Sequence, residues 1–201
     1  MEKKYKLLKD DYIDIHLYYD SEDESEMQEE YRLYRIQALR DFGDVKKGDL
    51  GGYIQSQKNL SHSGNCWIYD KSIAGDDSKV KNNAKVMDGA ILRGAAVVSK
   101  NAVLTNNAKL ASSAIVTDNA VVEFTDIYGE NVIKDNAVLD GGEIYGNLVV
   151  SGNAKLSGGF IFFGYKNGEI SGNIDLEFST IRKSFRDKFE TNEELLNYIN
   201  S

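Results

Sequence analysis

The stretch NAKVMDGAILRGAAVVSKNAVLTNNAKLASSAIVTDNAVV, residues 83–122, decides the fold. A small residue recurs in it every six positions, and an aliphatic residue follows two positions after each one. Positions two apart lie on the same side of an extended strand, so each pair points together into a core. Because a period of six does not match the 3.6-residue helix, the pattern predicts short β-strands joined by turns. The chain has no proline, so these turns need residues that tolerate positive φ.

A second, longer period divides the chain into coils. Three hexads make one coil of a triangular prism, and one corner of that prism is marked by asparagine followed by alanine or cysteine. The asparagines are separated by 18, 18, 18, 17 and 17 residues, at Asn65, Asn83, Asn101, Asn119, Asn136 and Asn153. We expect their side-chain amides to bond one another along that corner, at a spacing of about 4.8 Å.

The hexads from about Gly52 to Phe162 resemble the hexapeptide-repeat proteins, which implies an all-β fold, the left-handed parallel β-helix. The stretch DFGDVKKGDLGGYIQSQKNLSHSGNCWIYD, residues 41–70, is similar to the leading segment of the YdcK-like hexapeptide-repeat proteins of bacteria and their phages. That group has no established activity, so the resemblance implies an architecture without implying chemistry.

Both ends of the stack are expected to be capped, since bare strand edges invite aggregation. Residues 1–50 contain two segments of alternating polarity, YIDIHLYY and EYRLYRIQAL, which predict a β-hairpin over the N-terminal coil. An acidic loop at residues 20–30 joins them, and its composition is typical of a solvated loop. Residues 51–181 are then expected to form the β-helix.

Residues 182–201 are predicted to form a helical cap on the last coil. Thr191 and Glu194 have the spacing of a capping box, which places the start of a helix at about Asn192. The stretch RKSFRDKF, residues 182–189, is interpreted as another helical turn. The helix is expected to pack on the last coil through Leu195, Leu196 and Ile199.

Composition limits the classes of partner. The net charge of −8 argues against a nucleic-acid partner, because neutralising phosphates needs a basic surface. The single cysteine, Cys66, rules out an intramolecular disulfide. We find no apolar run long enough to cross a bilayer, so we expect no membrane partner and a cytoplasmic location, in a bacterium or an infected host cell.

Candidate catalytic residues are few. The resemblance to hexapeptide-repeat acyltransferases implies a histidine base at a subunit junction, for which His62 is the candidate; the alternative is a hydrogen-bonded or solvent-facing loop histidine. His16 alternates within a predicted strand, and two histidines do not supply the three-histidine zinc site of the carbonic anhydrases of this fold. Cys66 stands where later coils have alanine, which predicts a buried, inert thiol. The residues therefore favour a protein without catalysis, with His62 as the catalytic residue only if the enzyme alternative holds, and we expect no cofactor and no metal.

Aromatic residues cluster near the leading segment, at Phe42, Tyr53, Trp67 and Tyr69. They have two interpretations: a plug at the end of the first coil, or a recognition pocket for a partner or flat ligand. Further along, Asp126 and Tyr128 interrupt the inward-facing rows together. Either the prism widens there, with Tyr128 filling space, or a small polar pocket opens.

The outward positions of two adjoining faces carry rows of β-branched residues. Contiguous apolar patches of this size usually mark an interface, and the family resemblance implies trimers. We therefore expect a homo-oligomer, with a trimer favoured. The expected interface residues are Ile73, Ile91, Ile127, Ile144, Val97 and Ile115.

These features together predict a non-catalytic binding or scaffold protein. In its narrower form, it is a phage-encoded accessory protein that blocks or sequesters a host component, including one of host defence. The partner would be a host protein or a small ligand. Two alternatives stay open: an acyltransferase-like enzyme with its site at a subunit junction, and a purely structural assembly module.

Overall fold

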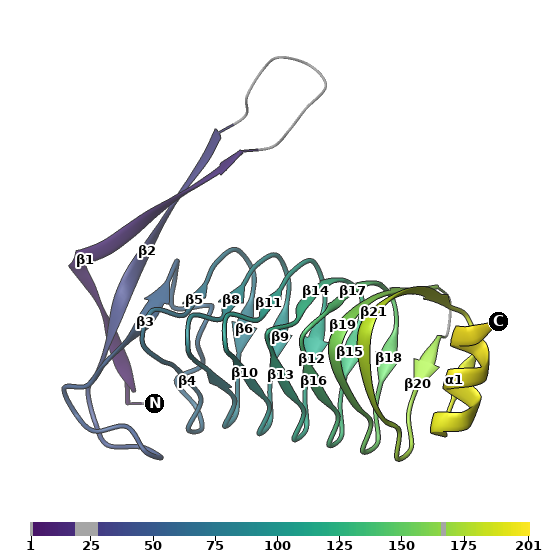
Figure 1. Cartoon of the computed structure of the whole chain (residues 1–201). Coiled ribbons are helices and arrows are strands. Elements are labelled where there is room, and N and C mark those ends of the chain that lie inside the picture. The colour runs from purple at the N-terminus through teal and green to yellow at the C-terminus, as the bar shows by residue number, and fades with distance from the viewer. Residues whose placement is uncertain (1, 19–27, 166–167) are drawn as a thin grey trace.

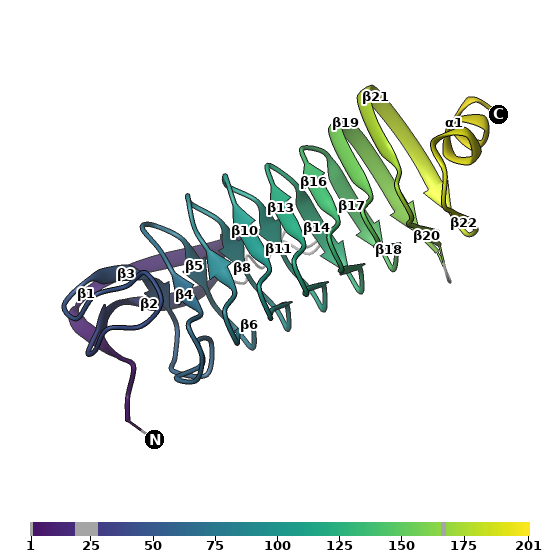
Figure 2. The same cartoon turned by 90° about the horizontal axis from the view of Figure 1, so that it is seen from below.

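The computed structural model describes residues 2–18, 28–165 and 168–201. These residues form a parallel β-solenoid of about eight turns, with a β-hairpin at one end and a short helix at the other (Figure 1). Figure 2 shows the coils following one another in a single row toward α1. The parallel β-helix predicted from the hexads is confirmed. In the described part of the chain no helix is both long and apolar enough to cross a membrane.

Each strand pairs in parallel with the strand one coil further along, which builds three walls. The first wall contains β4 (Trp67–Ile68), β7 (Lys85–Val86), β10 (Val103–Thr105), β13 (Val121–Glu123), β16 (Val138–Asp140) and the first part of β19 (Lys155–Gly164). The second wall contains β3 (Leu50–Ile54), β5 (Ile73–Ala74), β8 (Ile91–Leu92), β11 (Lys109–Leu110), β14 (Asp126–Gly129), β17 (Glu143–Gly146) and the last part of β19. The third wall contains β6 (Lys79–Val80), β9 (Val97–Val98), β12 (Ile115–Val116), β15 (Val132–Ile133), β18 (Val149–Val150), β20 (Glu169–Ile170) and β22 (Lys188–Phe189).

The core is the pair of rows predicted from the six-residue period. The small row and the aliphatic row of residues 83–122 are fully buried inside the prism. The corners between walls are made largely by glycine, aspartate and asparagine with positive φ, as the absence of proline predicts; Asp70, Asn82 and Asp118 have φ of 54°, 59° and 62°.

The asparagine column is confirmed from Asn83 to Asn153, whereas Asn65 joins it through its backbone amide, which donates to Asn83 Oδ1 at 3.3 Å. Asn83 Nδ2 donates to Asn101 Oδ1 at 3.1 Å, and Asn101 donates in turn to Asn119 at 3.1 Å. The chain of amides continues through the later coils to Asn173. This side-chain ladder ties each coil to the next along an exposed corner of the prism.

After Phe124, the residues of the second wall that face inward are not the ones that the sequence predicts. Asp126 and Tyr128 were expected to point inward, but Leu110 pairs with Ile127 and Lys109 pairs with Asp126, so Ile127 is the buried residue. The corner at Phe124, with φ 49°, is one residue shorter than the preceding corners of this edge. Because side chains alternate along a strand, this shortening reverses which residues face the core.

The N-terminal hairpin is confirmed as two antiparallel strands, β1 (Tyr5–Tyr18) and β2 (Gln28–Ala38). β2 also pairs antiparallel with β3, whose own pairing with β5 is parallel. The base of the hairpin covers the first coil with buried side chains, and further along the hairpin Ile15 and Tyr31 lie beside the second wall. Figure 1 shows the hairpin at the end of the prism opposite α1. Most of the acidic loop expected at residues 20–30 lies outside the described residues.

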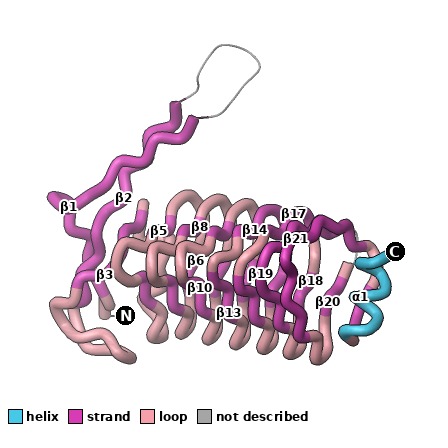
Figure 3. The backbone as a smooth tube through the Cα atoms, in the orientation of Figure 1, coloured by secondary structure: helices cyan, strands magenta, loops and turns pink. Residues whose placement is uncertain are grey.

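The C-terminal cap is partly as predicted. α1 (Asn192–Asn200) begins with the expected capping box, in which the Thr191 hydroxyl accepts from the Glu194 amide at 3.2 Å. Leu195 is buried, but Leu196 is 38% exposed, and the Tyr198 ring packs on the coil end instead. The helical turn expected at residues 182–189 is wrong: β21 (Asp175–Phe185) and β22 continue the sheets there, because each pairs with the coil beneath it. In Figure 3 the helix covers the end of the prism opposite the hairpin.

Candidate functional site

The four aromatic residues of the leading segment do not converge on one pocket. Phe42 and Trp67 pack edge to face with ring centroids 5.3 Å apart, and Tyr5 approaches the other side of Trp67 at 6.1 Å. Trp67 is 1% exposed and Phe42 is also buried. The expectation that Phe42 and Trp67 are binding residues is therefore corrected. Their buried rings leave no face for a ligand, because the base of the hairpin covers them.

Tyr53 and Tyr69 lie apart from that plug and are held by charged partners. The guanidinium of Arg35 lies 4.5 Å from the Tyr53 ring centroid. The Tyr69 hydroxyl donates to Asp44 at 2.7 Å, and Lys85 pairs with the same carboxylate. Burial and the Asp44 carboxylate raise the pKa of Tyr69. Tyr53 thus contacts the hairpin strand β2, and Tyr69 holds the loop at Asp44 to the solenoid.

His62, the candidate base, lies in the closed N-terminal cap. Its Nδ1 accepts from the Lys4 backbone amide at 3.2 Å, and its ring stacks on Tyr5 with centroids 4.3 Å apart. Its Nε2 is buried and has no hydrogen-bond partner among the described residues. Burial, followed by the charge of Lys4, lowers the pKa of His62, so the ring is neutral at pH 7. This geometry is that of a packed, hydrogen-bonded histidine.

Three of the six expected interface residues cannot lie on a free outer surface. Ile127 and Ile144 are fully buried inside the prism, for the register reason given above. Ile73 does face outward, but the hairpin covers it. Ile73 is buried and lines a small cavity together with Ile15 and Leu33 of the hairpin. The outer second wall is therefore covered by the protein's own hairpin over its first coils.

The other three expected residues keep partly exposed outward positions. Ile91 lies on the second wall, and Val97 and Ile115 lie on the third. On the third wall the apolar row continues in register through two further coils, as Val132 and Val149. This row is the part of the expected interface that stays on the surface.

The later coils of the second wall carry a surface feature that the sequence prediction missed. The rings of Tyr128, Tyr145 and Phe163 stack on one another, with successive centroids 5.3 Å apart and planes within 16°. They occupy one register position in three adjacent strands. The guanidinium of Arg182 closes the stack, 4.9 Å from the Phe163 centroid. We call these three rings the aromatic ladder.

Carboxylates accompany the aromatic ladder. The Tyr128 hydroxyl donates to Asp126 at 3.2 Å, and Lys109 donates to the same carboxylate at 2.8 Å. The Tyr145 hydroxyl donates to Glu143. Burial and Asp126 raise the pKa of Tyr128 to about 12, and the hydrogen bond to Glu143 raises that of Tyr145 to about 12. Both hydroxyls thus stay protonated and orient their rings outward beside an acidic row.

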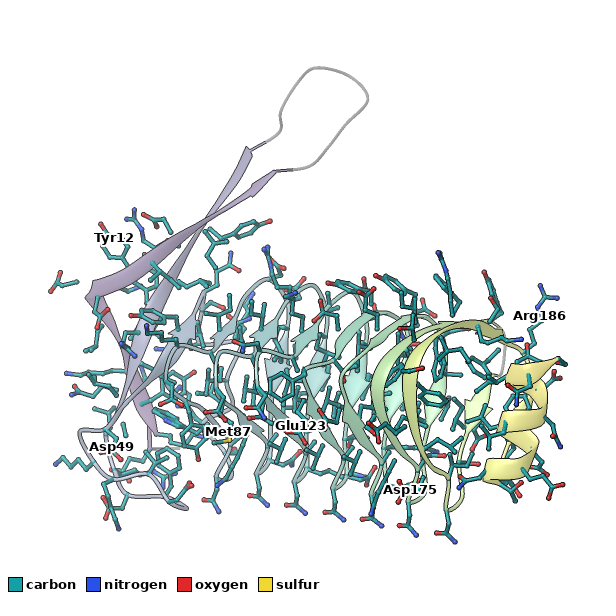
Figure 4. All side chains as sticks on the ribbon, in the orientation of Figure 1. Tyr12, Asp49, Met87, Glu123, Asp175 and Arg186 are labelled. Carbon is teal, nitrogen blue, oxygen red and sulfur yellow. The ribbon has the colours of Figure 1, made fainter. Side chains whose placement is uncertain are left out.

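A groove of about 680 Å³ runs along one edge of the aromatic ladder. A Cβ on Gly129 would lie 2.3 Å from the Gly146 carbonyl oxygen, so this floor admits only backbone. Tyr165, which is 47% exposed, and Arg186, labelled in Figure 4, form its far wall. The groove is lined by Gly129, Glu130, Gly146, Asn147, Gly164, Tyr165 and Arg186.

A second groove of about 350 Å³ lies at the opposite ends of the same strands. Asp126 and Glu143 line it, together with Phe124, whose ring is 57% exposed. The aromatic ladder therefore stands between two grooves, one with a glycine floor and one with an acidic side.

The sequence does contain a signal for this surface. The tetrads DIYG (126–129), EIYG (143–146) and IFFG (161–164) repeat an aromatic residue followed by glycine. With Ile127 assigned to the core, the third residue of each tetrad, which is aromatic in all three, faces outward in one row. The missed feature is thus a consequence of the misplaced register.

Comparison with known proteins finds a relative that is similar over part of the chain. No family model matches the chain. Over 54 residues, 26% of the chain, it is 41% identical to the uncharacterized acetyltransferase YdcK of Escherichia coli (strain K12). The match spans 17% of that protein, well under two thirds of its length. This weak homology and the parallel solenoid are consistent with a hexapeptide-repeat β-helix.

Proposed function

We propose that this protein is a non-catalytic binding protein whose rigid solenoid presents the aromatic ladder and its two grooves to a partner. The observation that carries the proposal is the outward stack of Tyr128, Tyr145 and Phe163 between those grooves. Aromatic side chains supply much of the binding energy of interfaces, since they bury large areas with few rotatable bonds.

The apolar row on the third wall supports self-association as part of the same proposal. Val97, Ile115, Val132 and Val149 form a continuous outward stripe along four coils. A stripe of this length favours burial against another surface. A homotrimer joined through this wall would leave the second wall, with its aromatic ladder, free to bind.

The narrower form of the proposal concerns the partner. A phage-encoded accessory protein in the cytoplasm of a bacterium would capture a host protein, including a component of host defence. The support for this form is the likeness of residues 41–70 to YdcK-like proteins of bacteria and their phages. The narrower form names a source and a partner for the protein. The proposed binding role does not depend on either.

An acetyltransferase is the second candidate, because the matched relative carries that name. Such an enzyme would need a base at a subunit junction. His62 is the candidate from sequence, yet its ring is stacked on Tyr5 within the cap and its Nδ1 already accepts a hydrogen bond. The geometry of this histidine favours the binding role over catalysis.

The test compares capture by the wild-type protein with capture by Tyr145→Ala, using immobilised protein and bacterial lysate. Tyr12→Ala is the matched control, since Tyr12 is an exposed tyrosine on the hairpin, away from the aromatic ladder (Figure 4). We expect the wild type and Tyr12→Ala to retain the same protein and Tyr145→Ala to lose it. Equal capture by all three contradicts a binding role for the ladder. Turnover of acetyl-CoA by the wild type, lost in His62→Ala, would establish the enzyme instead.

A further inference from the structure

A lysine and the single cysteine of the chain meet inside the N-terminal cap. The Lys4 side chain is fully buried, and its Nζ lies 3.3 Å from Cys66 Sγ. Nζ also donates to the Cys66 carbonyl at 2.7 Å and approaches the Gly64 carbonyl at 3.4 Å. Its hydrogen bonds and ion pairs among the described residues include no carboxylate. A buried amine with a thiol as its side-chain partner is unusual, because buried lysines normally pair with acids.

Packing does not require sulfur at this position. Ala84, Ala102 and Ala120 fill the equivalent inward position in the following coils. Around Cys66, carbonyl oxygens surround Sγ: Ser61 and Val80 at 3.6 Å, and Ser63 at 3.7 Å. These carbonyls only accept hydrogen bonds, so the cage suits a group on sulfur that carries an O–H.

We propose that Cys66 and Lys4 form a redox modification site, in which a peroxide joins the two side chains through a sulfur–nitrogen bond. In the first step the Cys66 thiol reacts with hydrogen peroxide, giving a sulfenic acid and one water; sulfur is oxidised by two electrons and the peroxide is reduced. In the second step the Lys4 amine attacks that sulfur. The S–N bond forms as the S–O bond breaks, and the hydroxide leaves with an amine proton as a second water.

The distance favours the second step. Reacting atoms held about 3–3.5 Å apart are near the attacking geometry, and Nζ and Sγ stand 3.3 Å apart before any movement. The competing capture of a sulfenic acid by a second thiol is absent within one chain, because Cys66 is the chain's single cysteine. Burial lowers the pKa of Lys4, which raises the fraction of neutral, nucleophilic amine.

The first step is expected to be slow. Burial raises the pKa of Cys66, and the thiolate is the form that peroxide oxidises. Sγ is also fully buried, so peroxide reaches it during local opening of the cap. The product joins residues 62 positions apart. It would hold the segment that precedes the hairpin onto the first coil.

The experiment exposes the folded, full-length protein to hydrogen peroxide and follows it by intact mass and by peptide mapping. We expect a cross-linked peptide pair containing Lys4 and Cys66 whose mass is about 2 Da below the sum of its two peptides, reversed by dithiothreitol; any oxidation of the three methionines adds about 16 Da each and is assigned separately by the peptide map. Cys66→Ala, which places at residue 66 the alanine of later coils, should lack this pair. Lys3→Gln, which alters the exposed neighbouring lysine without adding an oxidisable group, should show it.

Lys4→Leu removes the amine and leaves the thiol in place. It introduces no oxidisable group, and we expect peptide mapping to find about 16 or 32 Da added at Cys66 without a cross-link. Oxygen additions without a Lys4–Cys66 peptide pair in the wild type would overturn the proposal, as would an unchanged mass after prolonged exposure. These wild-type outcomes decide the question even where a Lys4 variant does not fold.

Discussion

The two halves of the second wall use the same outward side of the sheet for opposite purposes. In the first coils the hairpin lies over the wall: Ile73 is buried beneath it, and Tyr31 of the hairpin lies with its ring 4.8 Å from the Arg93 guanidinium. In the later coils the described residues of the hairpin do not cover the wall, and the half-buried rings of Tyr128, Tyr145 and Phe163 stack on its outer surface. One strand pattern thus serves as a packing surface where the cap covers it and as a display surface where it does not.

This difference shows that coverage by the hairpin, more than residue type, separates the buried aromatic residues of this protein from those on its surface. Trp67 and Phe42 have the composition of a binding site but lie under the hairpin base. The aromatic ladder has no element of the described chain above it, apart from the guanidinium of Arg182 at its end. The following predictions test that separation, beginning with the largest effect.

Trp67→Ala should cause the largest loss of stability, because the ring is 1% exposed and fills the plug between the cap and the first coil. We expect a loss of about 3–5 kcal/mol in the free energy of unfolding. Phe163→Ala, the matched change in the aromatic ladder, should cost about 1 kcal/mol. Urea unfolding of both variants measures the two values. Equal losses would show that the two regions are packed alike.

Leu33→Ala tests the cover itself. Leu33 is buried where the hairpin crosses the second wall, with its Cδ2 3.7 Å from the position a Cβ on Gly75 would take. We expect a loss of about 2–4 kcal/mol, and faster amide exchange in β5 where Ile73 becomes exposed. Hydrogen exchange by mass spectrometry reports both. Unchanged exchange in β5 would mean that the hairpin does not protect this wall.

Tyr145→Ala examines the bare region. Removing the central ring breaks two stacking contacts and the hydroxyl bond to Glu143, so we expect a stability loss of about 1–2 kcal/mol with the fold retained. Thermal unfolding and far-ultraviolet circular dichroism measure these quantities. Tyr145→Phe should keep the stacking and therefore most of the stability. If Tyr145→Phe is as unstable as Tyr145→Ala, the stability loss comes from the hydroxyl and not from the stacking.

The smallest expected effect is a pH dependence at the capped end. The pKa of His62 is lowered by burial, so the folded protein binds fewer protons there than the unfolded chain. The contribution of neutral His62 to the free energy of unfolding is therefore fully present above the ordinary histidine pKa of about 6.5, and it decreases as the pH falls below that value. His62→Phe, which keeps a ring against Tyr5, should lose less stability between pH 7.5 and 5.5. Parallel curves for the two proteins would contradict this account.

Much of the architecture could be predicted from local pattern. The six-residue period placed the core rows because alternation along a strand separates inside from outside. The asparagine spacing predicted the corner column, whose amides bond from coil to coil. Thr191 and Glu194 predicted the start of α1, since a capping box is formed by residues three apart.

The candidate site could be predicted less well, and the reason lies in one corner. The sequence shows that a residue is missing between Asn119 and Asn136, but the repeat does not tell at which corner it is missing. The structure places the short corner at Phe124. That position sends Ile127 inward and Tyr128 outward, which removes two expected interface residues and creates the aromatic ladder.

The sequence by itself thus determined the strand period, the coil length, the corner asparagines and the capping of both ends, because each depends on residues close together along the chain or repeated at constant spacing. Tertiary structure alone decided which face stayed bare and which pairs of distant groups met. The hairpin's path over Ile73 and the contact of Lys4 with Cys66 both depend on how the cap folds back on the first coil. No local repeat encodes that path, since it follows from the packing of segments dozens of residues apart.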